Sequence, residues 1–342
     1  EIKPQKISYN KSLKTISILH TGGTIASSIS YETGGVITRF TPEEIIAMFP
    51  ELKEIANIKS RLISNMFSED MNFNHYNLIA KEIEKELKQG SDGIIITHGT
   101  DTLGFTSAAL TFILENLSKP VILVASQRSS DRGSTDARLN LISAANFIAK
   151  TDFQDVAICM HETMSDDSCL IMPSLKTRKM HSSARNAFKV INDSAIARVG
   201  ADGNITFLKH HPKKEEKKLA LKLMNPKLKV GILKAHPNMS AKEVTNYDSF
   251  DALILEGTGF GLFPINKVDD FTKENEKIYG EIKRLAKKIP AIATSQTIHG
   301  RINLNVYSTG RLLQEAGVIG NNLDIITETA FIKIAWLLSN FP

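Results

Sequence analysis

The chain has 342 residues, of which 42% are hydrophobic and 23% charged, and its formal net charge at neutral pH is +5. This length suits two domains better than one, and the hydrophobic content is sufficient for a core in each. The composition excludes a wholly disordered chain, and the apolar runs are far shorter than the ~18 residues that cross a bilayer. Two cysteines, Cys159 and Cys169, are too few for a disulfide framework, so we expect a reducing, cytoplasmic compartment.

Short β-rich segments alternate with helical patterns along the chain, which is typical of a parallel sheet with helices on both faces. In the first part of the chain, we expect buried strands at residues 15–19, 93–97, 120–125 and 156–160, and helices at 75–89, from 103 to about 117, and from about 135 to 149. Gly90 is expected to end the first of these helices. In the second part, we expect strands at 229–234, 251–256 and 290–294, a helix at 274–287 and a final helix that ends near residue 339.

The composition changes between these two parts, because residues 209–229 hold eight lysines against two glutamates. We therefore predict an N-terminal catalytic domain at 1–199, a basic connector at 200–228, and a smaller C-terminal domain at 229–342. The connector is either a solvated link or a patch that faces the phosphates of an RNA. Base-specific reading of RNA is not expected there, because Phe207 is the one aromatic residue near it.

Three loops that directly follow expected strands are rich in glycine and hydroxyl side chains, namely residues 21–24, 98–102 and 257–261. Because open parallel sheets bind ligands beyond the carboxyl ends of their strands, these loops are the candidate site. They lack the Gly-x-x-x-x-Gly-Lys-Ser/Thr and Gly-x-Gly-x-x-Gly spacings of nucleotide sites.

A metal site is also a poor interpretation of this sequence. Cys159, His161 and Cys169 lie close together, but a structural zinc site needs four ligands and a catalytic one needs three with supporting groups. We interpret these residues as two structural thiols and a surface histidine.

An activated hydroxyl is the remaining chemistry of the candidate loops. Thr24 and Thr100 lie in two of them, and Asp101 follows Thr100 directly. A threonine hydroxyl is a weak nucleophile that needs an adjacent base, and a neutral lysine held near the carboxylate could act as that base. Spacing alone does not say which lysine. The alternative is a tight strand-to-helix turn at residues 21–24 with an N-cap threonine.

Two segments, Thr21-Gly-Gly-Thr-Ile-Ala26 and Ile96-Thr-His-Gly-Thr-Asp-Thr102, resemble the two signatures of the asparaginase/glutaminase family. The similarity extends from about Thr15 to Leu338. It implies a two-domain α/β fold with parallel sheets and helices on both faces, and an amidohydrolase with a threonine nucleophile. By this resemblance, Thr24 matches the nucleophile, Thr100 and Asp101 the second threonine and the acid, and Lys179 the catalytic lysine.

The resemblance also implies residues that bind the substrate. Ser68, with Glu69 beside it, matches the serine that holds the substrate α-carboxylate, and Asp101 would bind the α-amino group as well. Tyr31 approximately matches the tyrosine of the family's mobile lid.

Several segments are more similar to the glutaminase subunits of archaeal glutamyl-tRNA(Gln) amidotransferases than to free-standing asparaginases. They are Tyr31–Val36, Phe67–Met71, Ser126–Arg132, Arg178–Ser183, Asn186–Phe188, Thr294–Thr297 and Arg301–Tyr307. This branch implies that the chain hydrolyses glutamine and passes ammonia to a second protein of the amidotransferase, the ATP-using subunit, which converts Glu-tRNA(Gln) to Gln-tRNA(Gln). The chain itself would need no cofactor, since ATP and Mg²⁺ serve that partner. The alternative is a stand-alone type I asparaginase.

Sites of this family are completed at an interface between copies of the chain, so the resemblance implies a homodimer, here within a heterotetramer with the ATP-using subunit. The branch also carries a small β-rich domain before its asparaginase-like part, whereas Glu1 to Lys14 alone precede the first expected strand. Because the chain opens with Glu1 rather than Met, we expect either a trimmed form or the absence of that domain. A binding scaffold that has lost catalysis is a further alternative, but all four catalytic positions are intact.

Overall fold

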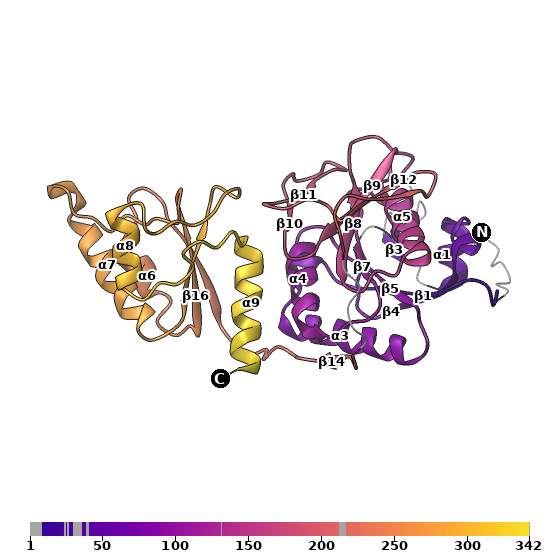
Figure 1. Cartoon of the computed structure of the whole chain (residues 1–342), viewed down its shortest axis with the longest axis horizontal. Coiled ribbons are helices and arrows are strands. Elements are labelled where there is room, and N and C mark those ends of the chain that lie inside the picture. Colours follow the sequence, from indigo (N-terminus) through magenta and orange to yellow (C-terminus); the bar gives the residue numbers. More distant parts are fainter. Residues whose placement is uncertain are drawn as a thin grey trace. The chain divides into compact units, whose positions relative to one another are not determined.

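The computed structural model describes residues 9–23, 25, 27–29, 36–38, 41–130, 132–211 and 217–341. The chain divides into two compact units, Glu1–Lys222 and Leu223–Pro342 (Figure 1). This division falls within residues 200–228, the predicted connector. None of the helices in the described residues is long and apolar enough to cross a membrane.

The first unit is built on a sheet of eight strands in its described residues, in the order β13-β12-β9-β8-β7-β5-β1-β4. The parallel strands are β4 (Asn57–Leu62), β1 (Thr15–His20), β5 (Gly93–Thr97), β7 (Val121–Val124) and β8 (Val156–His161). The antiparallel strands are β9 (Ser168–Pro173), β12 (Ala197–Gly200) and β13 (Ile205–Phe207).

The parallel α/β architecture predicted from the sequence is thus confirmed, with an antiparallel edge added to it. The reason is the length of the connection between β8 and β9, residues 162–167. A connection this short allows a hairpin, whereas a parallel crossover takes a dozen or more residues.

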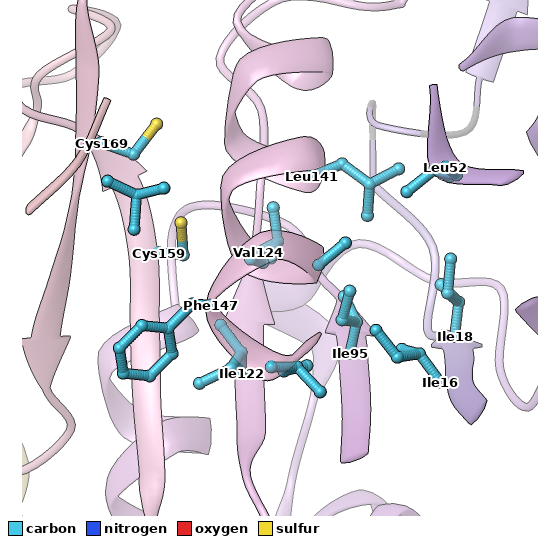
Figure 2. Close-up of a cluster of buried hydrophobic side chains, with 14 of the residues drawn as sticks. Ile16, Ile18, Leu52, Ile95, Ile122, Val124, Leu141, Phe147, Cys159 and Cys169 are labelled. Atoms are coloured by element: carbon cyan, nitrogen blue, oxygen red, sulfur yellow. The ribbon is translucent and has the colours of Figure 1, made fainter. Parts of the chain in front are cut away.

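Helices cover both faces of this sheet. The helices are α1 (Pro42–Met48), α2 (Leu52–Ile55), α3 (Phe73–Lys88), α4 (Leu103–Ile113) and α5 (Ala137–Lys150). Figure 2 shows α5 lying over one face, where Leu141 and Phe147 pack on Ile95, Ile122 and Val124 of the strands. α3 and α4 pack against each other and against β5 and β8. Because successive side chains of a strand point to opposite faces, each central strand is buried on both.

One helix ends earlier than its pattern predicts. The expected helix from 103 to about 117 stops at Ile113, because the next two residues form β6 (Leu114–Glu115), which pairs with β14 (Ala220–Leu221). Since β13 and β14 both pair with strands of the first unit, the described part of the predicted connector belongs to that unit as far as Lys222.

Two further small sheets belong to the first unit. β2 (Ser27–Ile29) pairs with β3 (Val36–Thr38), and β10 (Thr177–Lys179) pairs with β11 (Phe188–Val190), in both cases antiparallel. A 3-10 turn, η2 (Ser68–Asp70), precedes α3. Gly90 follows the end of α3 with a φ of +86°, the left-handed conformation that commonly ends a helix, as predicted.

The second unit has a parallel sheet of β15 (Val230–Lys234), β16 (Ala252–Gly257) and β17 (Ala291–Ser295), close to the expected bounds. Its other elements are α6 (Ala241–Thr245), η3 (Asp270–Thr272), α7 (Lys273–Ala286), α8 (Ser308–Glu315) and α9 (Thr327–Asn340). α9 covers one face, where Ile334 packs with Ile254, while α6, α7 and α8 lie on the other (Figure 1).

Candidate active site

The loops that follow β1 and β5 lie side by side, because these strands are neighbours in the parallel sheet. The backbone N–H and the hydroxyl of Thr21 both donate to the carbonyl oxygen of Thr97, at 3.1 and 2.9 Å. The segment after β4 joins them, since the N–H of Met66 donates to the Thr21 carbonyl at 3.2 Å. Three strand ends therefore meet at one edge of the sheet, where ligands of such sheets bind.

Two glycines allow this close approach. Gly22 and Gly23 have φ values of +114° and +82°, in the region that disfavours other residues. A Cβ on Gly22 would lie 2.3 Å from the Met66 carbonyl oxygen, and one on Gly23 would lie 2.9 Å from the backbone nitrogen of Gly99. The Gly22-Gly23 segment is therefore held against the loop that contains Thr100. Thr24 and Tyr31, the predicted nucleophile and lid residue, lie outside the described residues.

Lys179, Thr100 and Asp101 are brought together although they lie far apart in the sequence. Nζ of Lys179 donates to Oγ1 of Thr100 and to Oδ1 of Asp101, both at 2.8 Å. The Lys179 side chain is 16% exposed and that of Asp101 is 62% exposed. Both distances lie within the reach required for proton transfer between catalytic groups. The three residues can therefore work as one acid–base unit.

Ser68 lies directly against this unit at the start of η2. A Cβ on Gly99 would approach its Oγ to 2.8 Å, and the hydroxyl of Thr102 donates to its carbonyl oxygen at 2.6 Å. Ser68 is 2% exposed, and its hydroxyl has no hydrogen-bond partner among the described residues. Buried polar groups normally have a partner, so this hydroxyl is available to a ligand. Glu69 is exposed beside it.

Two buried histidines that the sequence analysis does not assign to the site support its loops. Nδ1 of His98 lies 2.7 Å from the Gly99 carbonyl oxygen, which can only accept, so Nδ1 carries the proton and Nε2 accepts from Thr106 at 2.8 Å. Nδ1 of His20 lies 2.7 Å from Oγ1 of Thr97. Burial lowers the pKa of His98 to about 4 and that of His20 to about 3. Both rings are therefore neutral supports at pH 7 rather than acid–base groups.

Lowering the pH should destabilise the protein through these two histidines. Their folded pKa values of about 4 and about 3 lie below the ordinary 6.5 of the unfolded chain, so the unfolded state binds more protons below pH 6.5. Stability is therefore lost as the pH falls, by up to about 2 kcal/mol per histidine between pH 6.5 and 5. Urea unfolding at pH 7 and pH 5 measures this loss. It should shrink in His98→Asn and persist in the exposed control His210→Asn; equal losses in both would contradict the assignment.

The position of His161 corrects one expectation. The sequence predicts a surface histidine, but His161 is 1% exposed because α5 and β9 cover it. Its Nδ1 lies 2.6 Å from Oδ1 of Asn140 on α5, and Cys169 is its partner across the β8–β9 pair. Cys159 and Cys169 are free, buried thiols. The described residues contain no group of three or more histidine, cysteine, aspartate or glutamate side chains that could hold a metal ion.

Two family models match the chain over most of its length. The model "Asparaginase, N-terminal" matches residues 15–213, and "Glutaminase/Asparaginase C-terminal domain" matches residues 229–341. The chain therefore belongs to the glutaminase/asparaginase family, as its two signatures predict.

The particular relatives are all named as the same subunit of glutamyl-tRNA(Gln) amidotransferase. The chain is 44% identical to that of Pyrococcus furiosus, over 99% of this chain and 74% of the relative. It is 40% identical to that of Methanococcus vannielii, over 100% of this chain and 78% of the relative. The resemblance to this branch of the family is thus confirmed.

Solved structures with the same fold are asparaginases. The thermostable L-asparaginase of Thermococcus kodakarensis aligns with a TM-score of 0.82 at 28% identity, covering 95% of this chain and 93% of that one. L-asparaginase I of Vibrio cholerae aligns with a TM-score of 0.80 at 26% identity, covering 96% and 94%.

Proposed function

We propose that this chain is the glutamine-hydrolysing subunit of a glutamyl-tRNA(Gln) amidotransferase and supplies ammonia for the conversion of Glu-tRNA(Gln) to Gln-tRNA(Gln). The observation that carries the chemistry is the contact of Lys179 Nζ with both Thr100 Oγ1 and Asp101 Oδ1 at 2.8 Å. The 44% identity to an amidotransferase relative favours this function over a stand-alone type I asparaginase, since the identity to the Thermococcus asparaginase is 28%.

The proposed covalent step begins at Thr24. Its Oγ bonds to the side-chain carbonyl carbon of glutamine while its proton passes to the Lys179 unit, and the carbonyl becomes an oxyanion. Backbone N–H groups of the glycine-containing loops are suited to stabilise that oxyanion. When the C–N bond breaks, the proton returns to the leaving nitrogen and ammonia departs. Water then attacks the glutamyl ester, which releases glutamate and restores the Thr24 hydroxyl.

The other site residues have proposed roles in this cycle. In its neutral form, the amine of Lys179 accepts the proton of a hydroxyl or a water, directly or through Thr100. Asp101 holds the amine in place and binds the substrate α-amino group. The unpartnered hydroxyl of Ser68 suits the substrate α-carboxylate, with Glu69 beside it. Tyr31 is proposed to close over the bound glutamine before attack.

The assembly follows from the same proposal. The chain acts in the cytoplasm as a homodimer within a heterotetramer that contains the ATP-using subunit of the amidotransferase. It uses no cofactor of its own, and the partner uses ATP and Mg²⁺. tRNA(Gln) reaches this chain indirectly, through the partner.

Glutamine hydrolysis by the isolated chain should be slow and should rise about tenfold or more when the ATP-using subunit and Glu-tRNA(Gln) are added. Ammonia released without an acceptor is wasted, and such gating requires that partner and tRNA bind the active state more tightly. Ammonia release from glutamine and from asparagine, with and without each component, measures it. Brisk asparaginase activity that ignores tRNA would instead support the stand-alone asparaginase.

A further inference from the structure

The hairpin that carries Lys179 is separate from the main sheet. Lys179 is the last residue of β10 and pairs with Phe188 of β11, in a two-stranded sheet of their own. The intervening residues, 180–187, form the tip of this hairpin. Because the catalytic amine stands where the strand gives way to the tip, its position depends on how the tip is held.

Arg185 ties the tip to two loops of the main sheet. Its Nε and Nη2 donate to the Ser134 carbonyl oxygen, at 3.2 and 2.6 Å, and its Nη1 donates to the Met164 carbonyl oxygen at 3.2 Å. Nη1 also donates to Oδ1 of Asp166 at 3.0 Å. The Arg185 side chain is 11% exposed, which is low for an arginine.

Both loops belong to the edge of the sheet where the candidate site lies. Ser134 is in the loop after β7, and residues 162–167 connect β8 to β9. β7 is the neighbour of β5, whose end leads into the Thr100 loop. Arg185 therefore fixes the hairpin to the same edge that positions Thr100 and Asp101.

The anchor on Asp166 is itself fixed from within the core. Oδ1 of Asp166 lies 3.0 Å from Nε2 of His161, whose Nδ1 contacts Oδ1 of Asn140 at 2.6 Å. Burial alone would lower the pKa of His161, but hydrogen bonds and charges from Cys169 and Asp166 outweigh it and raise the pKa. Asp166 is thus held between two donors, the buried His161 ring and the Arg185 guanidinium.

Global stability is a poor explanation for this arrangement. The Asp166 side chain is 62% exposed, and ion pairs at such positions contribute little to folding. The contacts to two carbonyl oxygens instead fix a direction, because a planar guanidinium donates in a rigid fork.

We propose that Arg185 is a positioning residue that holds the β10–β11 hairpin so that Nζ of Lys179 stays within reach of Thr100 and Asp101. This inference rests on the proposed function, because its effect is expressed through the Lys179 unit. A misplacement of about 1 Å in a catalytic group can cost about 100-fold in rate.

The test compares Arg185→Met with wild type in the complex with the ATP-using subunit and Glu-tRNA(Gln). We expect kcat for glutamine to fall about 10- to 100-fold with KM nearly unchanged, and added guanidinium to restore part of it. Because Arg185 acts through Lys179, adding Arg185→Met to Lys179→Met should cause no further loss. Arg198→Met is the matched control: it removes a pair with Glu162 beside the same β8–β9 turn and should keep kcat.

Two outcomes would overturn the proposal: an unchanged kcat in Arg185→Met where Lys179→Met is impaired, or a further loss in the double variant. If Arg185→Met folds poorly, Asp166→Ala removes one anchor at an exposed side chain and should lower kcat in the same direction. If the wild-type complex hydrolyses no glutamine, the proposed function fails by itself. Hydrogen exchange at residues 177–190 then decides the inference, since Arg185→Met should speed exchange there and Arg198→Met should not.

Discussion

Replacing Lys179 by methionine should lower glutamine turnover about 10²- to 10⁴-fold, the range typical of a positioned acid–base group. Thr100→Val should lose activity in the same range, because Nζ of Lys179 contacts the Thr100 hydroxyl at 2.8 Å. Parts of one catalytic unit do not act independently, so the double variant should lose far less than the product of the two effects. Initial rates of ammonia release, measured in the presence of the ATP-using subunit and tRNA, provide these numbers.

A matched control is available on the same hairpin. Lys189 is an exposed lysine of β11, opposite Arg178 of β10, and Lys189→Met should keep nearly full activity. Losses that multiply in the Lys179→Met, Thr100→Val double variant would show that the two residues do not form one unit.

Thr24→Ala should have the largest effect, a loss of about 10⁵-fold or more, as expected when a covalent nucleophile is removed. The fold should stay intact, which thermal unfolding checks. Thr24→Ser keeps a hydroxyl and should retain measurable turnover. Thr21 offers a second control, because its hydroxyl already donates to the Thr97 carbonyl oxygen. Thr21→Ser should keep turnover, and wild-type turnover in Thr24→Ala would remove Thr24 from the nucleophile role.

The parallel core of the fold was predictable from local pattern. Runs such as Gly93–Thr97 are apolar and buried throughout, and helical periodicity separates them, so strand order along the chain and the loops at the strand ends followed. The antiparallel edge was not anticipated, although the short connection between β8 and β9 contained the signal. The early end of α4 depends on pairing between β6 and β14, which no local pattern reveals.

The candidate site divides in the same way. Glycine and hydroxyl loops at strand ends identified Thr100 and Asp101 from the residues themselves, but spacing gave no reason to join Lys179 to them. That assignment came from the family resemblance, and the structure brings the three side chains together. Arg185 had no sequence signal at all, because two of its three partners are backbone carbonyl groups of distant loops.

The path of the amide nitrogen tests the central claim most directly. Glutamine labelled with ¹⁵N at the side-chain amide is supplied to the complex of this chain, the ATP-using subunit, Glu-tRNA(Gln) and ATP, and the tRNA-bound amino acid is then analysed by mass spectrometry. The proposed function predicts ¹⁵N in the new Gln-tRNA(Gln). With Thr24→Ala it predicts no product from glutamine but undiminished product from ammonium chloride. Absence of the label from tRNA, together with brisk asparagine hydrolysis that tRNA leaves unchanged, would contradict it.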